Sequence, residues 1–131
     1  MTSTIFKLFA IAFLAIAVAS CRTATVYNVN NAPLNAVKPA TMSQVDAAIK
    51  RAGGGLGWQM RDVAPGHIEA RLPIRTHLAV ADIYYTTKDF SIKYKDSNNL
   101  NYDKADNTIH SNYNGWVQNL EKAIIAQTSS L

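Results

Sequence analysis

The chain is poor in the residues that crosslink small domains or bind metal ions. Cys21 is its only cysteine among 131 residues, so no disulfide within the chain can staple the fold. Its three histidines, His67, His77 and His110, include no pair at the i, i+4 spacing of a helical metal-binding motif. We therefore expect no metal ion and no cofactor.

The sequence also lacks a recognisable catalytic motif. Ser91, His77 and Asp82 supply the residue types of a nucleophile, a base and an orienting acid. No glycine-rich turn or nucleophile elbow surrounds any serine, so this match is one of composition only. The glycine run 53–55 lacks the lysine of a phosphate-binding loop and follows a predicted helix, which favours a helix end.

The N-terminus carries an apolar run that is too short to cross a membrane. Residues 8–19 are uncharged and apolar, as in the h-region of a secretory signal. As a helix, residues 8–20 would span roughly 20 Å, against a hydrocarbon core of about 30 Å, and Lys7 interrupts any extension. The run ends in Val18-Ala19-Ser20-Cys21, which resembles the lipobox of bacterial lipoproteins.

The lipobox resemblance implies that residues 1–20 are a signal peptide, cut before Cys21, and that the Cys21 sulfur and the new amine are acylated. Two acyl chains anchor a protein stably in a bilayer. An aspartate directly after the acylated cysteine resembles an inner-membrane retention signal. This chain has Arg22 at that position, which favours the periplasmic side of the outer membrane in a Gram-negative source. The alternatives are a buried thiol or an unpaired cysteine in a secreted domain.

The formal net charge is +4. A basic protein can bind nucleic acid, but an export signal argues against that partner. We expect anionic lipid or lipopolysaccharide head groups as the opposite charges, and a slightly basic solvated surface is the alternative. The basic residues that would form such a surface are Lys50, Arg51, Arg61, Arg71 and Arg75.

Residues 21–40 are predicted to be a lipidated flexible tether. They combine several asparagines with Pro33 and Pro39 and show no sustained hydrophobic period. A flexible chain of this length reaches about 25 Å. A short strand at residues 25–29 is the alternative. Residues 41–131 are then a single domain.

Periodicity predicts the elements of that domain. A capping box of Thr41 and Gln44 begins a helix over residues 42–52, which the glycine run ends. Alternating apolar and polar residues predict strands at 56–63, 67–72, 76–85 and 90–95. An apolar stripe at helical spacing predicts a C-terminal helix; its members are Tyr113, Trp116, Val117, Leu120 and Ile124.

The predicted class is α+β, with a helix, a four-stranded antiparallel sheet and a C-terminal helix. Both helices should cover one sheet face. The expected core consists of Val45, Ile49, Ile68, Leu72, Ile83, Ile92, Tyr94, Trp116, Val117 and Leu120. Val80, Asp82 and Tyr84 should then face outward, and this face is either open to a partner or covered by residues 22–40.

Several motifs between Gly57 and Leu120 carry a family resemblance. The pieces are Gly57-Trp58, Ser91-Ile92-Lys93-Tyr94, Asn99-Leu100-Asn101-Tyr102, Ile109-His110, Tyr113-Asn114 and Trp116. Together they resemble a family of small lipoproteins of Proteobacteria. That family has no agreed activity, so the resemblance implies an envelope lipoprotein and no particular chemistry.

The polar and aromatic stretch 96–116 supplies a candidate binding surface. Its members are Asn99, Tyr102, His110, Tyr113 and Asn114. Amide and phenol groups are typical of glycan or peptide recognition, and a structural loop with asparagine turns is the alternative. We expect a non-enzymatic binding or structural role with an envelope protein, the cell wall or lipopolysaccharide. An envelope hydrolase or a glycan- or peptide-modifying enzyme is the alternative.

Overall fold

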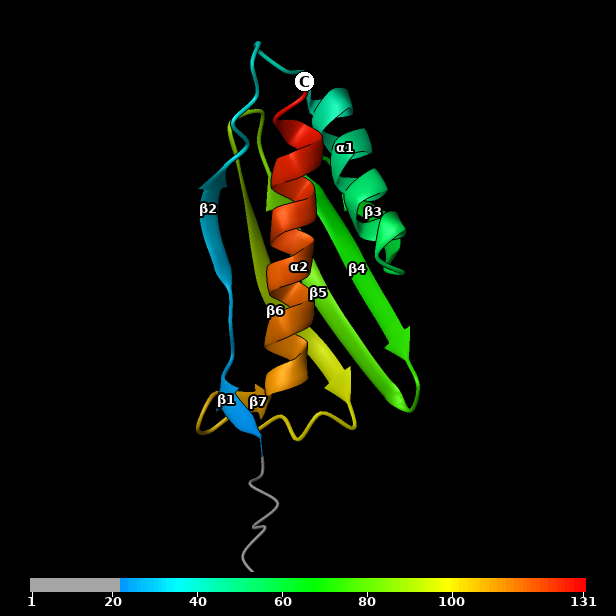
Figure 1. The fold of residues 1–131 in the computed structure, drawn as a ribbon, viewed down its shortest axis with the longest axis vertical. Coiled ribbons are helices and arrows are strands. Elements are labelled where there is room, and N and C mark those ends of the chain that lie inside the picture. The colour runs from blue at the N-terminus through cyan, green and yellow to red at the C-terminus, as the bar shows by residue number, and fades with distance from the viewer. Residues whose placement is uncertain (1–21) are drawn as a thin grey trace, which may run out of the picture.

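The computed structural model describes residues 22–131 (Figure 1). In chain order, its elements are β1 (Thr23–Thr25), β2 (Val29–Pro33), α1 (Met42–Gly55), β3 (Gln59–Ala64), β4 (His67–Ile74), β5 (His77–Tyr85), β6 (Asp89–Asn98), β7 (Thr108–His110) and α2 (Ser111–Thr128). The fold is α+β, as predicted. The predicted signal peptide and Cys21 lie outside the described residues. No helix of residues 22–131 is long and apolar enough to span a bilayer.

The main sheet has five strands instead of the predicted four. Its order is β2-β6-β5-β4-β3, and all neighbouring strands are antiparallel. The four predicted strands correspond to β3, β4, β5 and β6, and β2 is added beside β6. A separate two-stranded sheet pairs β1 with β7.

Residues 22–40 belong to the folded domain, so their prediction as a flexible tether is wrong. Val29 and Leu34 are 4% and 1% exposed, and the Ser111 N–H donates to the Arg22 carbonyl at 2.7 Å. A bulge in β2 and Pro33 at its end break the two-residue period of a strand, which hides β2 in the sequence. The folded domain therefore includes residues 22–40 and does not begin at residue 41.

Helix α1 begins where the sequence predicts and ends later. Thr41 Oγ1 accepts from Gln44 N at 3.2 Å, and Gln44 Oε1 accepts from Thr41 N at 2.9 Å, which completes the capping box. The helix continues past residue 52 to Gly55. The left-handed backbone conformation that turns the chain away from the helix lies at Gly57, whose φ is 90°.

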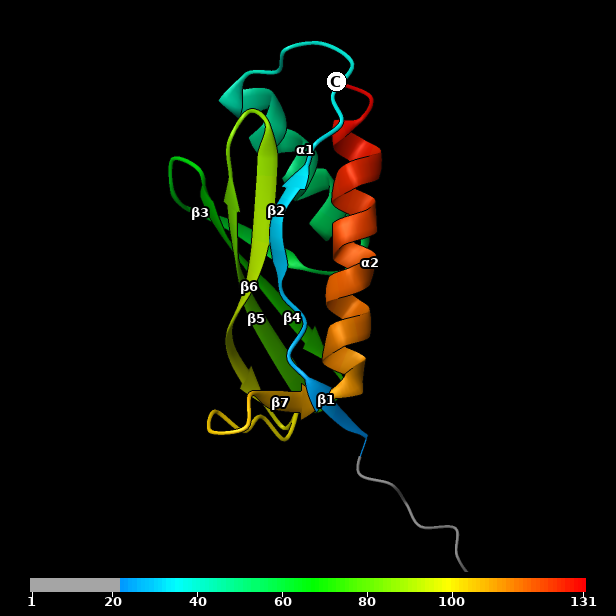
Figure 2. The ribbon, with the colours of Figure 1, turned by 90° about the vertical axis from the view of Figure 1, so that its left-hand side faces the viewer.

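Both helices lie on the same side of the sheet (Figure 2). Alternate residues on the strands, such as Ile68 on β4 and Ile83 on β5, point toward the helices and are fully buried. Of the predicted core, only Tyr94 and Trp116 are not fully enclosed, because both pack at its margin. Trp58 is the buried tryptophan, at 4% exposed.

The end of α2 is tied to the segment that follows β2. Tyr113, Val117, Leu120 and Ile124 form its buried stripe. Near the C-terminus, Thr128 Oγ1 donates to the Leu34 carbonyl at 2.8 Å. The long helix therefore connects the end of the molecule that holds β1 and β7 with the opposite end, where the C-terminus lies (Figure 1).

Tyr113 and Tyr85 allow a matched test of buried phenol groups. The Tyr113 hydroxyl is buried without a hydrogen-bond partner among residues 22–131, whereas the Tyr85 hydroxyl donates to Asp46 at 2.8 Å. We expect Tyr85→Phe to lower the free energy of unfolding by about 1 kcal/mol, and Tyr113→Phe to leave it unchanged or raise it by up to about 1 kcal/mol. Denaturant unfolding measures both variants. Equal losses would show that the Tyr113 hydroxyl has a partner.

Candidate functional site

Three of the five residues of the predicted binding surface are engaged within the fold. Tyr113 is fully buried in the core. His110 caps α2, since its Nδ1 accepts from Asn112 N at 3.1 Å. Asn114 accepts from the Tyr27 N–H at 2.9 Å and donates to the carbonyl of the last β1 residue at 2.8 Å. These three residues have structural roles because the start of α2 packs against the N-terminal strands.

Asn99 and Tyr102 lie in the loop between β6 and β7. Asn99 Nδ2 donates to Thr76 Oγ1 at 2.9 Å, which ties this loop to the β4–β5 turn. The Tyr102 ring stacks on Tyr94 with centroids 4.1 Å apart, and Tyr102 remains 38% exposed. The backbone takes left-handed φ angles of 57°, 52° and 54° at Asn99, Asn101 and Asn107. The asparagines therefore shape turns, which such residues tolerate well.

The predicted basic residues also separate in space. Lys50 pairs with one aspartate on α1 and one on β3, and Arg51 hydrogen-bonds to Gln127 on α2. Arg75 lies in the turn between β4 and β5. Only Arg61 and Arg71 come together, on the sheet face that the helices leave open.

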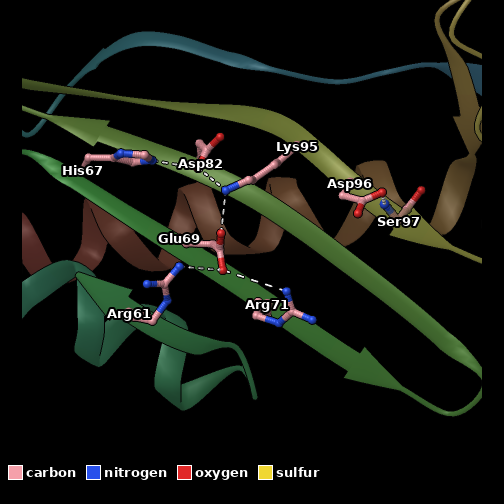
Figure 3. Close-up of polar contacts among 8 residues, drawn as sticks. All are labelled: Arg61, His67, Glu69, Arg71, Asp82, Lys95, Asp96 and Ser97. Carbon is pink, nitrogen blue, oxygen red and sulfur yellow. Dashed lines mark hydrogen bonds and ion pairs between the residues drawn. The ribbon is translucent and has the colours of Figure 1, made fainter. Parts of the chain in front are cut away.

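Arg61 and Arg71 meet Glu69 on this open face (Figure 3). Arg61 Nη2 lies 3.3 Å from Glu69 Oε1, and Arg71 Nη1 lies 3.9 Å from the same oxygen. Lys95 Nζ donates to Glu69 Oε2 at 2.6 Å. Glu69 is only 7% exposed, whereas the three cationic side chains remain largely accessible. We call Arg61, Glu69, Arg71 and Lys95 the Glu69 cluster.

Strand register assembles the Glu69 cluster. Arg61 on β3 lies opposite Glu69 on β4, which lies opposite Asp82 on β5. A shift in the β5–β6 register leaves Lys95 as an extra residue with no residue opposite. Such a bulge re-aims a side chain, and Lys95 Nζ reaches Glu69 and also lies 3.8 Å from Asp82. The alternation on β4 indicates which residues face outward, but no local pattern reveals this bulge.

His67 and Tyr84 extend the polar side chains of the open face. His67 Nε2 lies 2.7 Å from Asp82 Oδ1, and its ring stacks on Tyr84 with centroids 4.5 Å apart. Val80 faces the same way but is only 2% exposed. Because Val80 is almost completely covered, the exposed surface of this face is more polar than the sequence alternation predicts.

Electrostatics keep the Glu69 cluster charged. The hydrogen bond from Lys95 is the largest influence that lowers the pKa of Glu69; burial opposes it, and Arg61 adds to the lowering. The same hydrogen bond raises the pKa of Lys95. Three cations thus surround one carboxylate, and each guanidinium has further N–H donors. Paired donors of this kind suit a carboxylate or phosphate group.

The serine, histidine and aspartate considered as hydrolase residues each contact a different partner. Ser91 Oγ accepts from the Asn31 N–H at 2.9 Å, His77 Nδ1 lies 2.7 Å from the Asn99 carbonyl oxygen, and Asp82 pairs with His67. Within residues 22–131, no three His, Cys, Asp or Glu side chains gather as metal ligands would. The arrangement on the open face is suited to holding charged groups.

Comparison with protein-family models, curated proteins and solved structures finds no match to this chain. Its own residues and their contacts are therefore what indicate its function.

Glu69→Gln should change the pH dependence of stability. A carboxyl whose folded pKa is lowered contributes stability above its unfolded pKa of about 4.3, and this contribution is lost as the pH falls through the folded value. We expect a loss of about 1 kcal/mol at neutral pH, because the partners are exposed. The difference from the unchanged chain should shrink as the pH falls below about 5.

Urea unfolding at a series of pH values measures this difference. The matched control is Asp106→Asn, which removes one negative charge from an exposed loop position and should change stability little at any pH. A Glu69→Gln difference that stays constant from neutral to acid pH would show that ionised Glu69 does not stabilise the fold.

Proposed function

We propose that the chain is a bacterial envelope lipoprotein, acylated at Cys21 and anchored on the periplasmic side of the outer membrane, whose domain binds other molecules without catalysing a reaction. The apolar run and the lipobox-like residues before Cys21 support the anchor. The position of β1 supports it as well, because cleavage before Cys21 removes none of the described strands.

The Glu69 cluster is the observation that supports a binding role. Its two arginine side chains are 65% and 45% exposed, and both lie within ion-pair distance of a Glu69 oxygen on a face that neither helix covers. A planar guanidinium donates two parallel hydrogen bonds to a carboxylate or phosphate. We infer that the ligand is an acidic component of the envelope, such as the phosphate groups of lipopolysaccharide.

Cys21→Ser tests the anchor. The substitution removes the thiol that carries the diacylglyceryl group, so the variant should lose acyl labelling, remain unprocessed and keep its full precursor mass. Metabolic labelling with a fatty-acid analogue and mass spectrometry measure these changes, with Ser20→Ala as the control that keeps the thiol. Normal processing and labelling of Cys21→Ser would refute the lipoprotein assignment.

A charge-matched pair of double variants tests the binding role. Arg61→Gln with Arg71→Gln removes two cations from the open face, and Lys38→Gln with Lys122→Gln removes two from exposed positions elsewhere. We expect the arginine pair to weaken binding of purified lipopolysaccharide roughly tenfold or more, and the lysine pair far less. Calorimetry on the detergent-solubilised protein measures both. Equal losses would indicate a contact that depends on net charge only.

A further inference from the structure

The described chain starts one residue after the predicted acylation site and is already held in place there. The Arg22 carbonyl accepts from Ser111 N at 2.7 Å, and Thr23 lies opposite His110 in the β1–β7 pair. Consecutive Cα atoms are 3.8 Å apart. Cys21 is therefore within one residue of a strand that is part of the fold, and no flexible linker separates the two.

The same end of the molecule holds several other exposed segments. β1, β7, the 99–107 loop and the β4–β5 turn all lie there, opposite the end with the C-terminus (Figures 1 and 2). The hydrogen bond from Asn99 to Thr76 joins the loop to the turn. Val37 lies at the far end, where its N–H donates to the Leu131 carbonyl at 3.1 Å. The 18 residues of α2, which run between the two ends, span about 27 Å.

We propose that this end, made of Arg22, the β4–β5 turn and the 99–107 loop, is a membrane-contacting surface that rests on lipid head groups and holds the domain upright on the bilayer. The inference rests on the acylation of Cys21 proposed above. With the acyl chains in the bilayer, the cysteine lies at head-group depth, and the short connection brings β1 and its neighbours to the same level.

The chemistry of this surface fits lipid head groups. Arg22, Arg75 and Lys104 are exposed there, and such cations contact lipid phosphates. The exposed Tyr102 has the amphipathic ring that is enriched at membrane–water interfaces. Two exposed carboxylates of the same loop, Asp103 and Asp106, are outnumbered by these three cations, and Asp103 Oδ1 accepts from the backbone N–H groups of residues 105 and 106 at 2.9 and 3.2 Å.

Backbone hydrogen bonds hold the loop of the membrane-contacting surface in one shape, which favours one orientation of the domain. The loop is closed by a pair of backbone hydrogen bonds between Asp103 and Thr108, at 2.9 and 3.1 Å. In the upright orientation, the sheet runs away from the bilayer and the Glu69 cluster points sideways along the membrane. Asn99 and Tyr102 of the predicted binding surface then face lipid and not a soluble partner.

Single-cysteine labelling tests this orientation. Because the native thiol is acylated, Ala105→Cys and Val37→Cys each provide one free thiol, at exposed positions on the two ends. Each full-length lipoprotein is labelled with the same fluorophore and reconstituted in vesicles of phosphatidylethanolamine and phosphatidylglycerol that contain a head-group-attached quencher. We expect quenching at position 105 to be several-fold stronger than at position 37. Equal quenching, or stronger quenching at 37, overturns the upright orientation.

A linker insertion provides the matched control. About ten Gly and Ser residues between Cys21 and Arg22 add a reach of roughly 17 Å, so the difference between the two labels should largely disappear while the protein stays on the vesicles. Mass spectrometry of Cys21 separates the two proposals. Equal quenching on a protein with acylated Cys21 overturns the orientation alone, whereas absence of acyl groups overturns the anchor and the orientation together.

Discussion

The buried stripe of α2 and the inward residues of α1 join the same apolar cluster as Ile68, Ile83 and Ile92 of the sheet. Both helices lie on one face, so the whole core forms between that face and the helices. The second face stays in water, where a large apolar surface would be a liability. The strands place ionised and polar side chains there instead. One-sided packing therefore decides where the core lies and leaves the opposite face of the sheet open to solvent.

Glu69 gives the open face its organisation. A carboxylate that is 7% exposed needs charged or hydrogen-bonded partners, and strands on both sides of β4 supply them. Exposed ion pairs contribute little to stability individually. The main effect of the arrangement is therefore on the positions of the charged side chains. Glu69 positions Arg61, Arg71 and Lys95 while each keeps donors free, and a site on rigid strands is held more accurately than one on a loop.

The N-terminal segment connects the proposed anchor to this open face. A flexible tether would let the domain sample many orientations above a membrane. The pairing of β1 with β7 and the burial of Val29 and Leu34 remove that freedom. If Cys21 is acylated as proposed, this ordered segment makes one end of the molecule the membrane side, and the Glu69 cluster on the long face of the sheet then points along the bilayer.

By itself, the sequence determined the α+β class, the start of α1 at Thr41, the four strands β3 to β6 and the buried stripe of α2, because caps and periodicity are local. Within residues 67–72, Ile68, Ala70 and Leu72 alternate with His67, Glu69 and Arg71, and this pattern alone places the polar residues on one side of their strand. Only the tertiary structure decided that β1 and β2 are strands, and that Arg61 and Lys95 meet Glu69. Those outcomes depend on register and on one bulge, which arise from contacts between residues far apart in the chain and leave no periodic signal within any one segment.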